Sequence, residues 1–347
     1  MPDEFKIPLW YENGSVHAGL GYKDNVLLSS STSRGSGFWS AGADMMVYRL
    51  PSGGWQFHGL ASFDNIGYLD KSIGVGNEQS GVGMAQVTKS LGHDWKMGLG
   101  GNYLYQNQVF DASVTETNQY TNTQVLGHNL TGRWFVRKDF KPYWIEAEAS
   151  VSRQWLATPL DSFWQTGPRL TLGRSYGHGS DVALTYQWSH LAFDTREQFT
   201  AEGDPETDTH LRFHGQVVEA AWHHVWDKEK HWHTVTKLGL DINQDTGSGY
   251  FDFMQYRLME QIKYRGKTWE VSAYFRAGYY DFSVQTVSAT DLALRRKTML
   301  SAGLRGEKNL SKSFKVYASC TYDDSLSNVS YDRYQSRLVS GGVEYHF

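Results

Sequence analysis

Four histidines cluster around one short polar stretch of the chain, and imidazole is a common ligand of metal ions. They are His223, His224, His231 and His233. They flank the run Asp-Lys-Glu-Lys that begins at Asp227, which is typical of a tight turn. In an extended strand, adjacent side chains point to opposite faces, so the side chains of His223 and His224 diverge. We therefore expect a polar turn here and no bound metal.

A second set of residues supplies the side-chain types of a hydrolase. These residues are Ser189, His190, Asp208 and His210. A Ser-His-Asp centre needs a nucleophile, a base and an orienting acid in mutual contact, and the spacing of these residues matches no known order. A hydrolase therefore remains a less favoured alternative. We expect no catalytic residues and no cofactor.

Charged side chains recur at alternate positions within otherwise apolar stretches. This spacing places them on one face of a β-strand, opposite the apolar face. On a wetted face they could form charged rings that select solutes, or pairs that neutralise one another across neighbouring strands. Both interpretations stay open. The candidate pore-lining residues are Lys96, Arg133, Arg169, Glu146, Glu148, Lys237, Arg257, Arg276, Arg295, Lys297, Arg305 and Lys315.

Alternation of apolar and polar residues extends over most of the chain and is the signature of strands with two different surroundings. The pattern predicts about sixteen strands, within a range of roughly 14 to 18. The boundaries of the candidates are good to about two to four residues. The expected strands are 15–27, 38–49, 55–69, 81–90, 95–110, 125–137, 143–156, 164–176, 181–193, 211–226, 231–242, 250–264, 269–284, 294–306, 314–322 and 334–347.

The connections between these strands alternate between short and long. Tight turns such as 51–54 and 266–267 alternate with longer polar segments such as 112–124 and 200–210. Membrane barrels have short periplasmic turns and longer extracellular loops, and an even strand count returns the C-terminus to the periplasm. We therefore predict an all-β fold, a closed antiparallel transmembrane β-barrel. Residues 1–14 are expected to form a short periplasmic segment and 15–347 a single barrel.

Aromatic residues support this prediction, because amphipathic rings gather where lipid meets water. Those expected to open a strand directly after a tight turn are Trp55, Trp95, Tyr143, Trp164, Trp232, Trp269 and Phe314. A girdle at the opposite level is expected from Tyr103, Tyr105, Trp155, Trp188 and Tyr279.

Composition excludes several other classes. We find no run of 18 apolar residues, so a membrane-spanning helix is not expected. A net charge of −4 argues against a nucleic-acid partner, and the single cysteine, Cys320, allows no disulfide within the chain. The start Met1-Pro-Asp-Glu lacks the basic and apolar regions of a signal peptide. We therefore expect Met1 to be an engineered start.

The C-terminal strand ends on an aromatic residue, which is unusual because chain termini are usually frayed. Val343, Tyr345 and Phe347 share one face of this strand. The ending resembles the terminal strand of bacterial outer-membrane β-barrels, which is read by the barrel insertion machinery. The resemblance implies that these three residues form the insertion signal.

Short motifs at both ends of the barrel region add a second resemblance. One motif, Gly21-Tyr-Lys-Asp-Asn-Val, lies at the outer end of the first expected strand. Two others precede the last expected strand: the pair Ser327-Asn328 and the cluster Tyr331, Asp332 and Tyr334. They resemble the putative β-barrel porin type and the barrels of exopolysaccharide exporters. This resemblance implies a Gram-negative outer-membrane channel for passive passage of polar solutes or polysaccharide.

The alternative is the membrane barrel of a larger export or assembly machine, gated by a partner or by a missing N-terminal region. The expected partners are outer-membrane lipid, lipopolysaccharide, the insertion machinery and periplasmic export proteins. The longest expected connection, 112–124, is short for a loop that folds into the lumen. We therefore expect any constriction to come from side chains, from residues 1–14 or from a partner.

Overall fold

The computed structural model describes residues 9–115, 122–177, 179–288 and 290–347. Sixteen antiparallel strands within these ranges close into one barrel, as the sequence predicted. A separate two-stranded sheet, β10 (Gln198–Phe199) and β11 (Pro205–Glu206), lies in the connection that follows β9. The barrel strands are β1 (Trp10–Lys23), β2 (Ser36–Ser52), β3 (Trp55–Tyr68), β4 (Asn77–Gly92), β5 (Trp95–Asp111), β6 (Asn122–Phe140), β7 (Tyr143–Leu156), β8 (Phe163–Tyr176), β9 (Ser180–Phe193), β12 (Arg212–Val225), β13 (Trp232–Asp245), β14 (Phe253–Arg265), β15 (Trp269–Thr286), β16 (Leu294–Asn309), β17 (Phe314–Ser327) and β18 (Tyr334–His346).

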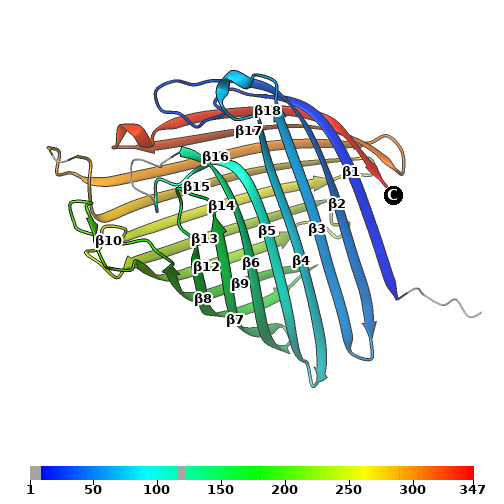
Figure 1. The fold of residues 1–347 in the computed structure, drawn as a ribbon. Coiled ribbons are helices and arrows are strands. Elements are labelled where there is room, and N and C mark those ends of the chain that lie inside the picture. The colour runs from blue at the N-terminus through cyan, green and yellow to red at the C-terminus, as the bar shows by residue number, and fades with distance from the viewer. Residues whose placement is uncertain (1–8, 116–121, 178, 289) are drawn as a thin grey trace, which may run out of the picture.

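The first and last strands pair with each other and close the barrel. β1 pairs with β18 in antiparallel register, with Ala18 opposite Val343. Beyond the strand, the N–H of Phe347 donates to the carbonyl of Gly14 at 3.0 Å. Closure of this kind is what hydrocarbon demands, because lipid offers no partner to an exposed backbone N–H or C=O. Figure 1 shows the blue and red ribbons of the two strands side by side.

The two ends of the barrel differ in their connections (Figure 1). Residues 53–54, 93–94 and 141–142 each join consecutive strands at one end, which we call the turn end. At the other end, the loop end, the described connections include 24–35 and 69–76, and they carry the two single-turn 3-10 helices η1 (Lys71–Ile73) and η3 (Ser330–Asp332). No helix in the described ranges is long and apolar enough to span a membrane.

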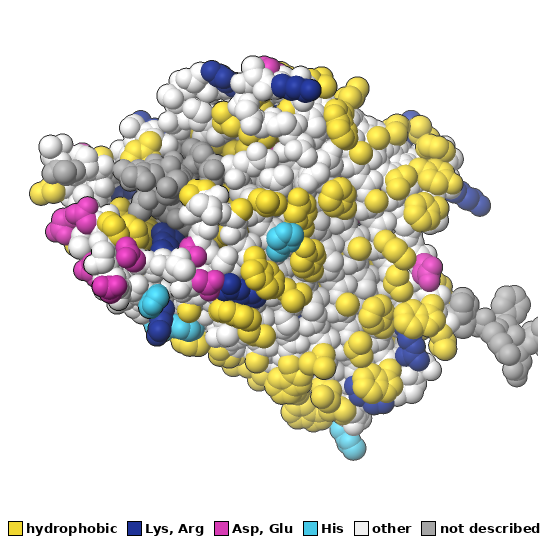
Figure 2. All heavy atoms as spheres, viewed as in Figure 1, with side chains coloured by type: hydrophobic (Ala, Val, Ile, Leu, Met, Phe, Trp, Pro, Cys, Tyr) yellow, Lys and Arg dark blue, Asp and Glu magenta, His cyan; other side chains and the backbone are white. Residues whose placement is uncertain are grey.

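The outer face of the barrel is apolar and bounded by aromatic side chains. Leu99, Leu238 and Leu304 are exposed on this face, and Figure 2 shows hydrophobic side chains spread over the visible outer wall. Most of the aromatic residues expected to follow a tight turn do lie at the turn end. Trp164 is an exception, because it follows the connection 157–162 at the loop end and joins the girdle there.

The first strand begins earlier than the sequence indicated. β1 starts at Trp10 rather than Ser15, so 10–14 belong to the barrel and not to a separate segment. These residues pair with β2, as Trp10 lies opposite Arg49, whereas the pairing with β18 starts only at Ser15. The short polar stretch before Ser15 suggested a segment outside the barrel. Pairing with the long partner β2 keeps it extended instead.

Apolar clusters lie at the loop end rather than along the axis of the barrel. One contains Val26, Phe38, Tyr68, Ile73 and Val75. The second joins Phe193, Leu211, Phe213 and Phe251. Both combine strand ends with residues of the connections, so they hold the loops against the wall. At these two places the loops pack against the wall of the barrel rather than projecting freely.

Candidate functional site

The inner wall of the barrel carries the candidate pore residues. Directly paired residues in a sheet share a face, and the register places Glu148 of β7 opposite Arg169 of β8. Following the register from strand to strand puts all twelve candidates on the inner face. Their side chains therefore point away from the apolar outer wall. Their role in transport stays a prediction.

A cluster of ion pairs covers the wall from β6 to β8. The carboxylate of Glu148 lies 3.2 Å from Arg169 Nη2 and 3.6 Å from Arg133 Nη1. Arg133 also reaches across β5 and donates to Gln86 of β4. Gly100 makes this approach available, because a Cβ at that position would lie 2.8 Å from Arg133 Nε. Glu148 is thus the shared counter-ion of two arginines.

Closer to the turn end, the same wall continues with paired charges. Arg137 lies 3.9 Å from Glu146 and 2.8 Å from Asp139. Lys96 Nζ lies 2.8 Å from the other oxygen of the Asp139 carboxylate. Two cations on β5 and β6 therefore share Asp139, and Glu146 supplies a second acid beside Arg137, so the charges in this part of the wall balance.

The opposite wall repeats the arrangement on β12 to β18. Lys237 lies 3.5 Å from Glu219, and Arg257 lies 2.8 Å from Asp241. Pairs nearer the turn end include Arg305 with Glu307 at 2.6 Å, Lys315 with Glu307 at 3.0 Å, and Lys315 with Glu344 at 3.7 Å. Most candidate charges are therefore paired across or along strands, which favours the second of the two interpretations.

Arg276 of β15 differs from its neighbours. It is exposed on the inner face, and within the described ranges no carboxylate lies at ion-pair distance from it. Its guanidinium lies 5.1 Å from the ring of Tyr274, in a hollow that also contains Glu219, Lys237 and Ser301. An unpaired cation on a wetted wall interacts with passing solutes more strongly than a paired one.

Two candidates do not line an open pore, and this corrects the expectation from sequence. The side chains of Arg295 and Lys297 on β16 are 3% and 0% exposed. They are covered because Lys297 Nζ lies 2.6 Å from Asp111 Oδ2, at the end of β5, and also donates to the hydroxyl of Ser113. These side chains hold a segment of the chain instead of contacting solvent.

That segment, 111–115, crosses the mouth of the barrel, and we call it the crossing segment. β5 and β16 are seven strands apart counted one way around the ring and nine the other way, so they stand on opposite walls. In Figure 1 the loop-end parts of β5 and β6 bend over the barrel. Ala112 and Ser113 are almost fully buried. The mouth is therefore narrowed by the chain itself, which the sequence analysis did not expect.

The crossing segment is fixed by a buried network. Arg295 donates to the carbonyl of Ser113 at 2.9 Å and to Gln285 Oε1 at 2.6 Å, and it forms an ion pair with Asp332 of η3 at 2.6 Å. On the other side, Arg196 in the connection after β9 donates to the carbonyl of Thr115. A buried charge is costly unless it is paired, and these contacts together hold the crossing segment in a single position.

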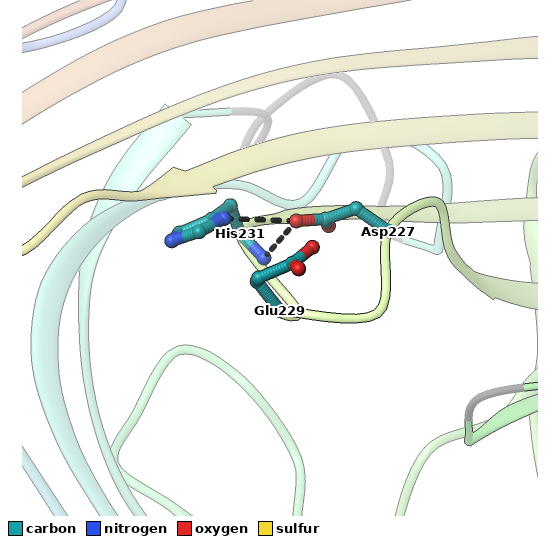
Figure 3. A group of neighbouring side chains, drawn as sticks. All are labelled: Asp227, Glu229 and His231. Carbon is teal, nitrogen blue, oxygen red and sulfur yellow. Dashed lines mark hydrogen bonds and ion pairs between the residues drawn. The ribbon is translucent and has the colours of Figure 1, made fainter.

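The acidic and histidine residues at the β12–β13 turn do not form a ready metal site. Candidate ligand atoms of Asp227, Glu229 and His231 lie within 4.8 Å of one another (Figure 3). The Asp227 carboxylate, however, accepts the backbone N–H groups of Trp232 and His231 at 2.9 and 3.0 Å. These N–H groups, with the His231 ring, hold the pKa of Asp227 below its usual value. The Asp227 carboxylate therefore acts as a turn cap.

The residues considered for a hydrolase are not brought together. Ser189 and His190 are adjacent in β9 and point to opposite faces. His190 stacks on Trp188 and lies 3.4 Å from His214 through the two Nδ1 atoms. Asp208 and His210 lie in the connection between β11 and β12. No nucleophile, base and acid converge among these four residues.

The register places the expected insertion signal on the outer face of the barrel, at the turn end. Tyr345 pairs with Phe314 across β17 and β18, and their rings are 5.1 Å apart. Val343 shares their outer face, and Phe347 is 73% exposed just beyond the strand. The three side chains therefore form a row on the outer surface at the turn end. Recognition of this row stays a prediction.

The residues that sequence reasoning missed are Asp111 and Ser113. A strand needs about 9 to 11 residues to cross a membrane. β5 has 17 residues, so its end must rise above the lipid or bend over the lumen. The excess length of β5 was the feature of the sequence that could have pointed to Asp111 and Ser113. The partner of Asp111 could not be found from it, because Lys297 lies 186 residues further along the chain.

Comparisons with known proteins agree with this architecture. No family model and no curated protein matches the sequence. Among solved structures, OccAB1 of Acinetobacter baumannii has a TM-score of 0.51 at 9% identity, covering 97% of each chain. An anion-selective porin from Comamonas acidovorans (TM-score 0.45, 10% identity, 97% and 99% covered) and a bacterial polysaccharide outer membrane secretin (0.44, 12%, 96% and 98%) are also similar. The chain therefore has the fold of an outer-membrane β-barrel, with sixteen antiparallel strands in the residues that the structure describes.

Proposed function

We propose that this barrel is a passive channel for small polar solutes, constricted at its extracellular mouth by the crossing segment. The observation that carries the proposal is the inner wall, where charged side chains replace an apolar core over the full ring of strands. A sixteen-stranded barrel is too wide for side chains to fill, so such a wall encloses water. Water and small solutes then cross without an energy source.

The crossing segment favours small solutes over a polymer. Its anchors, Lys297 and Arg295, are buried and fully paired with Asp111, Ser113 and Asp332, so displacing it would break several charged contacts at once. Removing one partner of a buried ion pair is strongly unfavourable. A polysaccharide would need the mouth to open, whereas a small solute passes beside a fixed segment. Catalysis plays no part in this proposal.

Swelling of protein-containing liposomes in sugars of graded size tests the proposal. We expect influx of the smallest sugars and a steep decline as the sugar grows. The control is a protein preparation whose folded state is verified by the shift in gel mobility on boiling. Folded protein that admits no sugar would contradict the proposal. Equal influx of small sugars and long oligosaccharides would contradict the constriction.

A further inference from the structure

Three cations lie against aromatic rings on the outer face of the barrel, at the turn end. The register pairs Trp55 with Lys89, Trp95 with Lys138 and Tyr143 with Arg174. Directly paired residues share a face of the sheet, and the three rings are exposed on the outer wall. The cations therefore point outward as well, and we call Lys89, Lys138 and Arg174 the cation row. Figure 2 shows basic side chains beside hydrophobic ones near the turns.

Each member of the cation row is held close to its ring. Lys89 Nζ lies 4.7 Å from the ring centroid of Trp55, and Lys138 Nζ lies 5.3 Å from that of Trp95. The guanidinium carbon of Arg174 lies 5.6 Å from the ring centroid of Tyr143. A cation over an aromatic face is attracted by the ring. The same contact thus recurs on three successive hairpins.

The charges of the cation row stand at the border between the apolar wall and water. Two positions along their strands, Val87 and Leu172 are exposed on the same outer face as Lys89 and Arg174. Lys89 donates to the carbonyl of Gly53 in the turn at 2.8 Å, and Lys138 donates to a turn carbonyl in the same way. The apolar stems therefore cover the wall while the charged heads stay at the level of the turns.

The positive charge of the cation row is not neutralised by the described part of the chain. Within those ranges, no carboxylate lies at ion-pair distance from Lys89, Lys138 or Arg174. The row therefore differs from the charges of the lumen, most of which are paired. An ammonium has three N–H donors, so each lysine keeps donors for a partner outside the chain.

Other pairs at the same level of the barrel are of two kinds. Trp10 lies opposite Arg49, Trp269 opposite Lys308, Trp232 opposite Tyr264 and Phe314 opposite Tyr345. The last two are purely aromatic, so their part of the belt contributes no charge. The cation row lies on β4, β6 and β8, where neighbouring cations are about 10 Å apart because they are separated by two strands. Positive charge is therefore concentrated on one side of the belt.

We propose that the cation row binds the headgroup phosphates of anionic phospholipids in the membrane leaflet at the turn end. Such a lipid fits both parts of the surface, because its acyl chains cover the wall beside Val87 and Leu172 while its phosphate contacts the cations. Basic side chains at a membrane surface attract anionic lipid, and one of them favours it about fivefold over neutral lipid. This inference does not depend on the proposed channel function.

Native mass spectrometry of the folded protein tests the proposal. The protein is released from micelles that contain equal amounts of phosphatidylglycerol and phosphatidylcholine with the same acyl chains. Both lipids carry a phosphate, but only phosphatidylglycerol has a net negative charge. For wild-type protein, we expect adducts of phosphatidylglycerol to exceed those of phosphatidylcholine about fivefold. In the triple variant Lys89→Gln, Lys138→Gln and Arg174→Gln, the ratio should fall below about twofold.

A second triple variant is the matched control. Lys228→Gln, Lys230→Gln and Lys267→Gln remove the same charge from exposed positions in the turns 226–231 and 266–268, away from the cation row. This variant should keep the wild-type ratio. Lys89→Arg, Lys138→Arg and Arg174→Lys should keep it too, and they test the row if the glutamine variant does not fold. The shift in gel mobility on boiling verifies folding of each variant.

Three results would overturn the proposal. The first is equal binding of the two lipids by wild-type protein. The second is an equal loss of preference in the cation-row and control variants, which would show that net charge alone attracts the lipid. The third is a wild-type spectrum in which a second copy of the chain is bound and phosphatidylglycerol is not.

Discussion

Lys297 Nζ on β16 lies 2.6 Å from Asp111 Oδ2 at the end of β5, and the two strands stand on opposite walls of the barrel. The contact joins residues 186 positions apart and draws the crossing segment over the mouth. Both side chains are nearly inaccessible to solvent, so the charges are held by each other and by Ser113. In the proposed channel, permeability would therefore depend on a contact outside the membrane-spanning wall.

Replacement of Lys297 by methionine should release the crossing segment. The change leaves Asp111 buried without its counter-ion, and breaking a buried pair in this way costs roughly 3 to 5 kcal/mol. We expect a larger and noisier single-channel conductance. Lys263→Met is the control, because Lys263 pairs with Glu270 near the periplasmic turns, far from the mouth. An unchanged current trace for Lys297→Met would show that the segment does not limit flow.

The shared counter-ion Glu148 should set the charge preference of one wall. Glu148→Gln leaves the guanidinium groups of Arg133 and Arg169 without their carboxylate, so the lumen gains net positive charge. In a salt gradient, the reversal potential should move toward the value for anions. Glu260 of β14 is paired with Thr236 and Phe275 on the outer face, so Glu260→Gln removes an acid outside the lumen and should leave the reversal potential where it is.

Removing the charge of Arg276 should shift the reversal potential in the direction opposite to Glu148→Gln. Because it is exposed and has no carboxylate partner within the described ranges, Arg276→Ala removes positive charge that solutes feel directly. The reversal potential should move toward the value for cations. Arg305→Ala is the comparison, since Arg305 is neutralised by Glu307. A larger shift for Arg305→Ala than for Arg276→Ala would refute the distinction between paired and unpaired charges.

Loss of the terminal aromatic residue should impair assembly more than stability. Phe347 is largely exposed and adds little packing to the folded barrel. Phe347→Ser should therefore reduce the amount of folded protein in the outer membrane of cells, while refolding into detergent remains close to normal. Leu310→Ser, at a turn position that is also largely exposed, serves as the control. Equal yields of both variants in cells would contradict a role in insertion.

The Asp227 turn should show a characteristic acid titration. Backbone N–H groups of Trp232 and His231 stabilise the carboxylate and lower its folded-state pKa. The stabilisation is therefore present above the unfolded value of about 3.9 and is lost as pH falls through the lower folded value. The amide resonances of residues 231 and 232 should titrate with a midpoint below 3.9. A midpoint at or above it, or its persistence in Asp227→Asn, would disprove the cap.

Much of the fold follows from local pattern. The alternation around Glu146 and Glu148 predicts both the strand and the face, because a strand between lipid and water repeats every two residues. The start of β1 was placed five residues too late, because the polar stretch before Ser15 gave no sign of its pairing with β2. The burial of Lys297 could not be predicted, because a cation that binds Asp111 across the barrel has the same local spacing as one that faces water.

The most direct measurement of the central claim is the current through a single folded barrel in a planar bilayer. The account predicts steady, ohmic conductance that rises in Lys297→Met. Electrical silence of wild-type protein whose folded state is verified by its gel mobility would contradict it.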